Sequence, residues 1–365
     1  MNVLDIDHVE LYVGDARQVA YYLCTAFGFR ICGQGGPETG LTGQRSLLLR
    51  QGGVQILLTS ALTADHPVAE YVSQHGDGVA VVAFGSTDVE QAYAEAVAAG
   101  ATSVTPPRRY ARDDAAVVVA TVSGFEDVVH RLVRRDGSRG EFLPGAIEMI
   151  AADPESGDEL LQVIDHAAVC LPAGELEPTA RYYENVFGFS QIFTEYIEVG
   201  EQGMDSRVVQ SSSGGVTFTF LQPDLSRRAG QIDDFLTWHG GAGVQHLAFG
   251  TRDIVSAVRT FGRRGVGFAA TPASYYDVVR DWLDPRDADV AALRELGVLV
   301  DRDHWGLMFQ IFTQSMHVRR TLFFELIERH GARTFGTSNI KALYEAKERE
   351  LAGVRQPTEA AGGRA

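Results

Sequence analysis

Short stretches in which hydrophobic and polar residues alternate recur along the chain, and each is followed by a helix-like stretch and further alternating stretches. This succession begins near residues 4, 78, 162 and 243. Alternation with a period of two predicts β-strands, and the Gly, Pro and Asp residues between the stretches predict turns. One helix for several strands favours an α+β fold with a strongly curved sheet over a doubly wound parallel sheet.

The two halves of the chain resemble each other. Residues 6–30 begin with IDHVELYV and end with AFGFR, while residues 164–190 begin with IDHAAVCLP and end with VFGFS. Residues 78–85 read GVAVVAFG, and residues 243–250 read GVQHLAFG. Because such self-similarity indicates repeated structural units, we predict tandem βαβββ modules that pair into two open half-barrel domains, each with a cavity inside.

The polar, turn-rich stretch AADPESGDE, residues 151–159, indicates the boundary between the halves. We therefore predict an N-terminal domain over residues 1–152 and a C-terminal domain over residues 153–336. Residues 337–353 have the pattern of an amphipathic helix that begins after a capping Ser. Residues 354–365 are predicted to be a disordered tail.

The composition is typical of a globular protein, and its charge argues against a polyanionic partner. The chain has 365 residues, with 32 basic and 48 acidic side chains and a net charge of −16. This charge argues against binding to nucleic acids or anionic membranes. No apolar run approaches 18 residues, and the start of the chain does not read as a secretory signal. The three cysteines show no metal-binding spacing, so we expect reduced thiols and a cytoplasmic protein.

Two of three equivalent strand positions differ between the halves. The second half has polar residues at all three, and they are listed here with their first-half counterparts: His166 (His8), His246 (Val81) and Glu325 (Arg131). Since side chains alternate between the two faces of a strand, the neighbours of each residue place all three on the inner face of the half-barrel.

The carboxylate of Glu325, within FFELI, is costly to bury alone. A metal ion shared with two imidazoles would compensate, and two His with one carboxylate form the facial triad of non-haem Fe(II) oxygenases. Zinc with the same ligands is an alternative. Two interpretations without a metal also stay open: the histidines as hydrogen-bonded core residues, as we interpret His8, and Glu325 paired with a buried arginine.

Six motifs are similar to those of the 4-hydroxyphenylpyruvate dioxygenase and 4-hydroxymandelate synthase family, which has the vicinal oxygen chelate (glyoxalase-like) fold. They are GAGVQHLAF, QIDDFL, SYYD, FQIFT, FFELIERHG and SNIKALYEA, and they are spread along the second half between residues 231 and 346. The resemblance implies Fe(II) bound by His166, His246 and Glu325, with 4-hydroxyphenylpyruvate and O₂ as substrates. We expect the first half to be structural and the protein to be a homo-oligomer.

The two branches of the family differ in product. Both decarboxylate the keto acid oxidatively; the dioxygenase then hydroxylates the ring to give homogentisate, and the synthase hydroxylates the benzylic carbon to give 4-hydroxymandelate. This chain has Thr219 and Leu221 where dioxygenases have Pro and Asn, and Ile340 where they have a Phe that stacks on the ring. Because loss of an aromatic wall frees the ring to tilt, we expect 4-hydroxymandelate synthase. The alternatives are the homogentisate-forming dioxygenase and a non-catalytic binding protein of this fold.

The resemblance also assigns further residues to the substrate pocket. These are Ser206, Gln231, Gln245 and Gln310 as polar groups, Phe312 and Phe335 as aromatic walls, and Asn339 and Ile340 on a C-terminal lid helix. Core packing is the alternative for the aromatic residues. For the glutamines the alternative is a position at a strand edge, or one behind the residues that contact the metal or substrate. Gln245 points away from His246 in an ideal strand, so its role requires a β-bulge or a neighbouring cavity.

Overall fold

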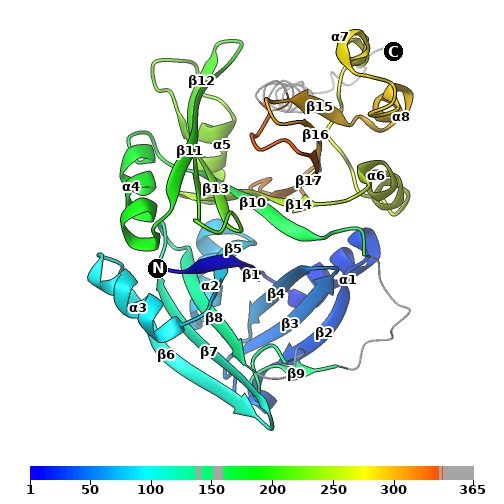
Figure 1. Cartoon of the computed structure of the whole chain (residues 1–365). Coiled ribbons are helices and arrows are strands. Elements are labelled where there is room, and N and C mark those ends of the chain that lie inside the picture. The colour runs from blue at the N-terminus through cyan, green and yellow to red at the C-terminus, as the bar shows by residue number, and fades with distance from the viewer. Residues whose placement is uncertain (137–140, 151–158, 337–338, 340–365) are drawn as a thin grey trace, which may run out of the picture.

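The computed structural model describes residues 1–136, 141–150, 159–336 and 339 of the chain. Each half forms one curved sheet with helices around it; the first half is coloured blue to cyan and the second green to red (Figure 1). The first half contains β1 (Val3–Tyr12), α1 (Ala16–Phe27), β2 (Arg30–Gly35), the 3-10 helix η1 (Pro37–Thr39), β3 (Gln44–Gln51), β4 (Val54–Ala61), α2 (Pro67–His75), β5 (Gly78–Ser86), α3 (Val89–Ala98), β6 (Ser103–Arg112), β7 (Ala115–Ser123), β8 (Val129–Asp136) and β9 (Glu148–Met149).

The second half repeats this order and adds two helices before its last three strands. It contains β10 (Val163–Cys170), α4 (Leu176–Phe187), β11 (Ser190–Val199), β12 (Gln202–Gln210), β13 (Thr217–Pro223), α5 (Gln231–His239), β14 (Gly243–Gly250), α6 (Ile254–Arg263), α7 (Ala273–Trp282), α8 (Val290–Leu296), β15 (Leu299–Arg302), β16 (Leu307–Phe312) and β17 (Phe323–His330).

The strand order of both sheets follows from paired βαβββ modules. The first sheet runs β6-β7-β8-β5-β1-β4-β3-β2-β9, and the second runs β11-β12-β13-β10-β14-β17-β16-β15. In each sheet the first strands of two modules are antiparallel neighbours at the centre, and each pairs in parallel with the last strand of its own module. The predicted α+β vicinal oxygen chelate fold is therefore confirmed.

The Gly-Phe pairs that recur in the sequence end the equivalent helices α1 and α4. Gly28 and Gly188 both adopt the left-handed conformation, with φ of 75° and 68°. Glycine reaches this conformation without a steric penalty and so stops a helix by closing its last turn. Asp15 begins α1 by accepting hydrogen bonds from the backbone N–H groups of Arg17 and Gln18.

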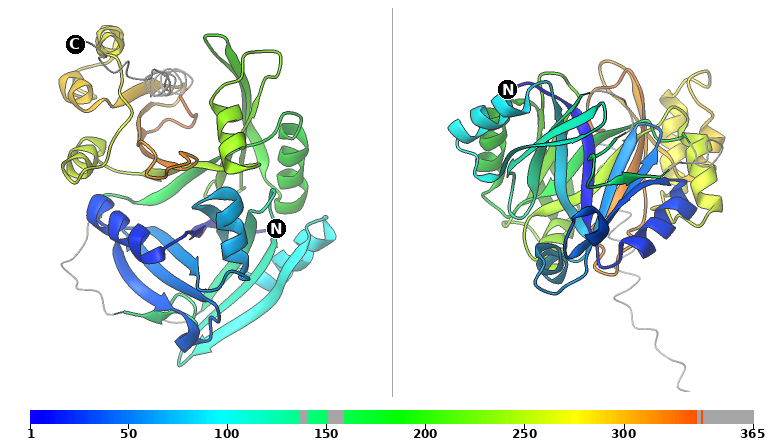
Figure 2. Two further views of the ribbon diagram at one scale, coloured as in Figure 1. Left: turned by 180° about the vertical axis from the view of Figure 1, so that it is seen from behind. Right: turned by 90° about the horizontal axis from the view of Figure 1, so that it is seen from below.

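The convex faces of the two sheets share one hydrophobic core. Val9 on β1 and Ala167 on β10 both belong to it, whereas His8 and His166, one residue away, face the other side of their sheets. Phe27 of α1 lies 5.2 Å from the ring of Phe261 on α6 and 5.4 Å from that of Phe324 on β17. The sheets thus lie back to back, with their concave faces turned away from each other (Figure 2).

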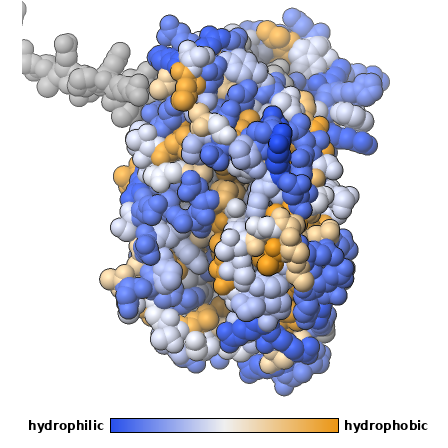
Figure 3. Space-filling model, turned by 90° about the vertical axis from the view of Figure 1, so that its left-hand side faces the viewer, coloured by the Kyte–Doolittle hydropathy of each residue, from blue (hydrophilic) through white to orange (hydrophobic). Residues whose placement is uncertain are grey.

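The surface agrees with the mixed composition of the sequence. On the face shown in Figure 3, hydrophilic residues predominate and hydrophobic residues form small patches between them. No helix in the described part of the chain has the length and apolarity needed to cross a membrane.

The predicted domain boundary and C-terminal segments fall on residues that the structure does not describe. The stretch 151–158 is one of these gaps, so the boundary at 152/153 stays a prediction, although each sheet takes its strands from one half only. The predicted lid helix, 337–353, and the predicted tail, 354–365, also lie outside the described residues, except for Asn339.

Candidate metal centre

Three neighbouring strands bring the predicted triad together. His166 lies on β10, His246 on β14 and Glu325 on β17. Ala248 is opposite His166 on one side and Glu325 on the other, so these three residues form one row across the sheet. His246 lies two residues away from Ala248 on the same face. The small side chain of Ala248 leaves the space between the three polar groups open.

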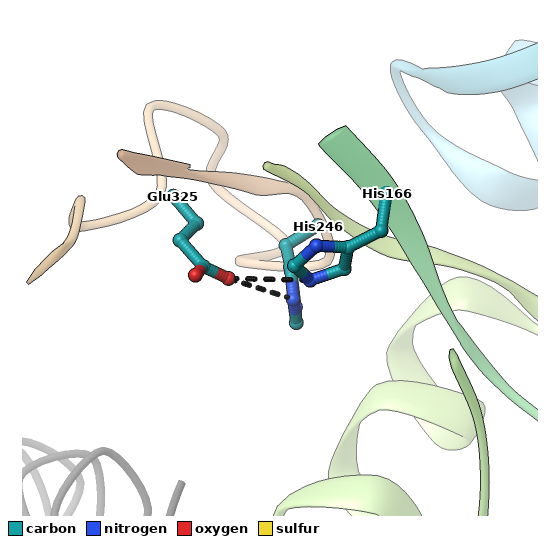
Figure 4. Close-up of side chains that lie close together, drawn as sticks. All are labelled: His166, His246 and Glu325. Carbon is teal, nitrogen blue, oxygen red and sulfur yellow. Dashed lines mark ion pairs between the residues drawn. The ribbon is translucent and has the colours of Figure 1, made fainter. Parts of the chain in front are cut away.

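The three side chains converge on one point of the concave face. One ligand atom from each lies within 4.8 Å of the other two. Glu325 Oε2 is 3.4 Å from Nε2 of His166 and 3.4 Å from Nε2 of His246 (Figure 4). Ligand atoms bound about 2.0–2.2 Å from a single ion are roughly 3 Å apart. The geometry and chemistry of these donors therefore fit a shared metal ion.

Burial and mutual charge determine the protonation of the cluster. Burial alone would raise the pKa of Glu325, but the His166 and His246 imidazoles outweigh it and hold that pKa at about 2. Burial would lower the pKa of His166, but the charges of Glu325 and Asp165 raise it to about 9. Among the described residues, the partners of Glu325 are two imidazoles and an amide rather than an arginine, which disfavours the alternative of an Arg–Glu pair.

A second layer of charge supports His166. Asp165 Oδ1 lies 2.8 Å from His166 Nδ1. Arg329 donates to both carboxylate oxygens of Asp165, from Nε and from Nη2, at 2.8 Å each. Burial tends to raise the pKa of Asp165, but its hydrogen bonds to Arg329 and His166 lower it well below its usual range. Asp165 is therefore a carboxylate, and it accepts a hydrogen bond from Nδ1 of His166.

A chain of amides holds the other oxygen of Glu325. Gln310 on β16 donates from Nε2 to Glu325 Oε1 at 2.9 Å. Asn339 Nδ2 in turn donates to Gln310 Oε1 at 2.7 Å, and the Tyr275 hydroxyl on α7 lies 3.2 Å from Asn339 Oδ1. The chain of amides orients the carboxylate and connects it to Asn339 and the Tyr275 hydroxyl.

Aromatic rings surround the triad. The Phe335 ring meets His166 edge-on at 5.0 Å, and the Phe323 ring stacks on His246 at 5.0 Å. Phe312 is the strand partner of Glu325 and lies 6.1 Å from the His246 ring. The predicted walls Phe312 and Phe335 are thus both next to the cluster.

The other predicted pocket residues of β12 and β13 lie on the same concave face. Thr219 shares a row with Ala168 and His246, and Leu221 pairs with Cys170 and Ser206. The Thr219 hydroxyl is buried and has no hydrogen-bond partner within the described part of the chain.

The predicted glutamines at residues 231 and 245 occupy different settings. Gln231 is the first residue of α5 and is half-buried. Gln245 is the extra residue of a β-bulge, because Ala168 pairs with His246 and the next residue, Val169, pairs with Val244. The bulge brings Gln245 Oε1 to 3.3 Å from His246 Nδ1. Ile340 lies outside the described residues, so its position stays a prediction.

In the first half, the positively charged side chain of Arg131 occupies the position of Glu325. Arg131 Nη1 lies 3.2 Å from His8 Nε2, and Arg131 Nη2 donates to Glu10 at 2.8 Å. Glu10 occupies the position of Ala168 in the second half, and Thr59 also donates to it. His8 is thus the buried, hydrogen-bonded histidine that the sequence predicts.

Asp165 and Arg329 were not singled out by the sequence analysis, and a signal for both exists. The first half has Asp7 and Arg135 at the equivalent positions. Comparing the halves for differences finds His246 and Glu325, and comparing them for identities finds His166 together with this pair. Phe323 had no such signal, because it reads as one more hydrophobic residue of a buried strand.

Comparison with known proteins agrees with this geometry. Residues 5–128 and 163–311 match the model of the Glyoxalase/Bleomycin resistance protein/Dioxygenase superfamily. The chain is 35% identical over 356 residues to 4-hydroxyphenylpyruvate dioxygenase from Dictyostelium discoideum, which covers 94% of this chain and 97% of that one. The chain belongs to the 4-hydroxyphenylpyruvate dioxygenase family. Another relative, probable 4-hydroxyphenylpyruvate dioxygenase 2 from Aspergillus fumigatus, is 34% identical over 95% of this chain and 93% of its own.

The synthase branch of the same family is represented among solved structures. A structure of a mutant of 4-hydroxymandelate synthase from Streptomyces coelicolor has a TM-score of 0.88 and 46% sequence identity. The match covers 96% of this chain and 100% of that one. The predicted family is thus confirmed, and the predicted dioxygenase class is confirmed at the level of the family.

Proposed function

We propose that the chain is an Fe(II)-dependent 4-hydroxymandelate synthase, which converts 4-hydroxyphenylpyruvate and O₂ into 4-hydroxymandelate and CO₂. The observation that carries this proposal is the buried cluster of His166, His246 and Glu325. Its support is the 46% identity to a structure of 4-hydroxymandelate synthase.

The three side chains would hold the ion on one side and leave its other side to the substrates. When bound, Fe(II) supplies the binding of the 2-keto acid and the activation of O₂ that oxidative decarboxylation requires. His166 and His246 contribute neutral donors, and Glu325 contributes the negative charge. The surrounding rings of Phe312, Phe323 and Phe335 exclude water from the reacting groups.

Three positions favour benzylic over ring hydroxylation. Leu221 is an apolar residue on the concave face, so the polar group that dioxygenases have there is missing. Ile340 replaces an aromatic wall, and Thr219 adds a buried hydroxyl near His246 that the substrate can engage. A shift of the reacting carbon by about 1 Å is sufficient to change the outcome of a reaction.

Product analysis tests the proposal. Purified protein with Fe(II), ascorbate and 4-hydroxyphenylpyruvate should consume O₂, release CO₂ and form 4-hydroxymandelate, identified by chromatography. Homogentisate as the main product would instead support the dioxygenase, the alternative that the curated relatives favour.

The double variant Leu221→Asn, Ile340→Phe tests the steric basis of the product. It restores the polar group and the aromatic wall of the dioxygenase pattern, and stacking is worth about 0.5–1.5 kcal/mol. We expect a measurable fraction of homogentisate, on the order of a tenth of the product or more, since 1.4 kcal/mol changes a ratio about tenfold. An unchanged product ratio would contradict the steric account.

Metal analysis separates iron from the alternatives. We expect protein purified without air to take up about one Fe(II) per chain, and Glu325→Ala to lose it. Preferential retention of zinc would favour the zinc interpretation. A chain that binds 4-hydroxyphenylpyruvate equally well with Glu325→Ala and without iron would be a non-catalytic binding protein.

A further inference from the structure

We propose that Asp165 and Arg329 form a positioning pair that fixes the His166 ring with Nε2 free to bind the metal. The pair touches neither the substrates nor the ion and acts through His166. This inference rests on the proposed function, because it presumes that a metal ion binds at His166.

A β-bulge makes the contact between neighbouring residues possible. Ile164 pairs with Phe249 and His166 pairs with Ala248, so Asp165 is an extra residue of β10. In a regular strand Asp165 and His166 would point to opposite faces, whereas a bulge turns the extra residue out of that alternation. Asp165 Oδ1 can therefore accept the Nδ1 proton of His166, at 2.8 Å.

Arg329 fixes the carboxylate in its turn. Its two hydrogen bonds to Asp165 use both oxygens, which leaves the carboxylate one orientation. A third nitrogen of Arg329 donates to the carbonyl of Thr334 at 2.7 Å, and its guanidinium lies 5.3 Å from the Phe335 ring. Arg329 thus holds both the carboxylate behind His166 and the ring that lies against it.

The first half shows what this arrangement does to a histidine. Asp7 is likewise the extra residue of a bulge, and its Oδ1 lies 2.6 Å from His8 Nδ1. Arg135 donates to both oxygens of Asp7, at 2.8 and 2.6 Å. On the other side of the ring, His8 Nε2 faces Arg131 at 3.2 Å.

An arginine can only donate, so His8 Nε2 must accept and its proton must be on Nδ1. In the first half, the Asp7–Arg135 pair therefore directs the Nε2 lone pair of His8 towards a cation, which is the guanidinium of Arg131. In the second half the equivalent pair presents the His166 lone pair to the metal, as carboxylates behind metal-binding histidines do in general.

Asp165→Asn tests the pair with almost no change in shape. The Asn amide can adopt two orientations. In the first, its NH₂ group replaces Oδ2 and faces Arg329 Nε. In the second, its NH₂ group replaces Oδ1 and faces both Arg329 Nη2 and His166 Nδ1. The first orientation repels the guanidinium, and the second favours a proton on Nε2. We expect the dissociation constant of Co(II), measured without substrate by calorimetry and by its visible absorption, to rise about 10- to 100-fold.

Asp7→Asn is the matched control, since Asp7 makes the same three contacts in the half that does not contain the proposed metal ligands. We expect a similar fall in melting temperature for both variants and an unchanged Co(II) dissociation constant for Asp7→Asn. Arg329→Lys and Arg135→Lys form a second matched pair if an Asn variant fails to fold. Lysine keeps the charge without the two-pronged contact, so Co(II) binding should weaken in Arg329→Lys alone.

The outcomes separate this inference from the proposed function. Co(II) binding in Asp165→Asn within about twofold of the unmodified protein, or equally weakened in Asp7→Asn, overturns the positioning role while the metal site stands. Failure of the unmodified protein to bind Co(II) or Fe(II) overturns the proposed function, and the positioning role with it.

Discussion

Glu325 combines complete burial with a negative charge, and its surroundings compensate that charge with two imidazoles and one amide. Glu325→Gln keeps the shape and removes the charge. We expect metal affinity to fall by at least about 100-fold, more than for loss of an outer partner, and O₂ consumption to stop. Metal titration and an oxygen electrode measure these effects, while a melting curve verifies the fold. Undiminished metal binding would exclude Glu325 as a ligand.

The raised pKa of His166, about 9, gives the site a distinct pH dependence. In the metal-free protein the proton on His166 stabilises the fold fully below pH 6.5, and this contribution is lost as the pH rises through about 9. A metal ion must displace that proton. We therefore expect metal affinity to rise between pH 6.5 and 9, by up to about tenfold per pH unit, and then to level off. Co(II) titrations across this range measure the slope, and a flat profile would contradict it.

The residues that could be predicted from the sequence are those whose chemistry conflicts with their setting. A carboxylate in FFELI and an imidazole in GVQHLAFG stand out against hydrophobic neighbours. Asp165 could not be predicted in this way, because an acidic residue near the start of a strand is ordinary, and only the bulge turns it towards His166. Thr219 and Leu221 needed the family pattern.

At the scale of elements, β16 carries an amide where the first half has none. The partner of Gln310 across the sheet is Ile327, and the equivalent pair in the first half is Val119 and Val133. The amide therefore accompanies Glu325 and is not a requirement of the fold.

Gln310→Leu removes the contacts to Glu325 and Asn339 together. Because each buried polar group without a partner costs about 1–3 kcal/mol, we expect the free energy of unfolding to fall by roughly 2–4 kcal/mol and metal binding to weaken. Urea unfolding and Co(II) titration measure the two effects. A change in stability with unaltered metal binding would show that Gln310 does not orient the carboxylate.

The strands could be predicted better than the short helices. Alternating residues and the repeated Gly-Phe pairs indicate the four modules, and the structure has them. Helices α7 and α8, in the additional stretch of the second half, were not predicted. They have ten and seven residues, so most of their stability comes from packing against neighbouring elements, each other included, and little of it from local sequence.

At the scale of the whole molecule, the first half has the charged side chain of Arg131 where the second half has Glu325 of its candidate metal ligands. Arg131→Met leaves Glu10 buried without its partner, and we expect the free energy of unfolding to fall by about 3 kcal/mol. Adding Glu10→Leu should recover much of this loss. Urea unfolding of the single and double variants measures it, and Co(II) affinity should stay unchanged in both. Equal stability of the single variant and the unmodified protein would show that the ion pair is dispensable.

The homo-oligomer stays a prediction, and light scattering of the purified protein tests it by measuring the mass of the assembly.

The shared core limits how far this enzyme could be shortened to the half that carries the triad. Glu325 points into the concave face, and its neighbour Phe324 points the opposite way, onto Phe27 of the first half. The strand that bears the carboxylate is thus backed by a segment nearly 300 positions earlier in the chain. A miniaturised catalyst made of residues 159–336 alone would expose that aromatic surface to solvent, and its makers would have to redesign the reverse side of the sheet before its front could function.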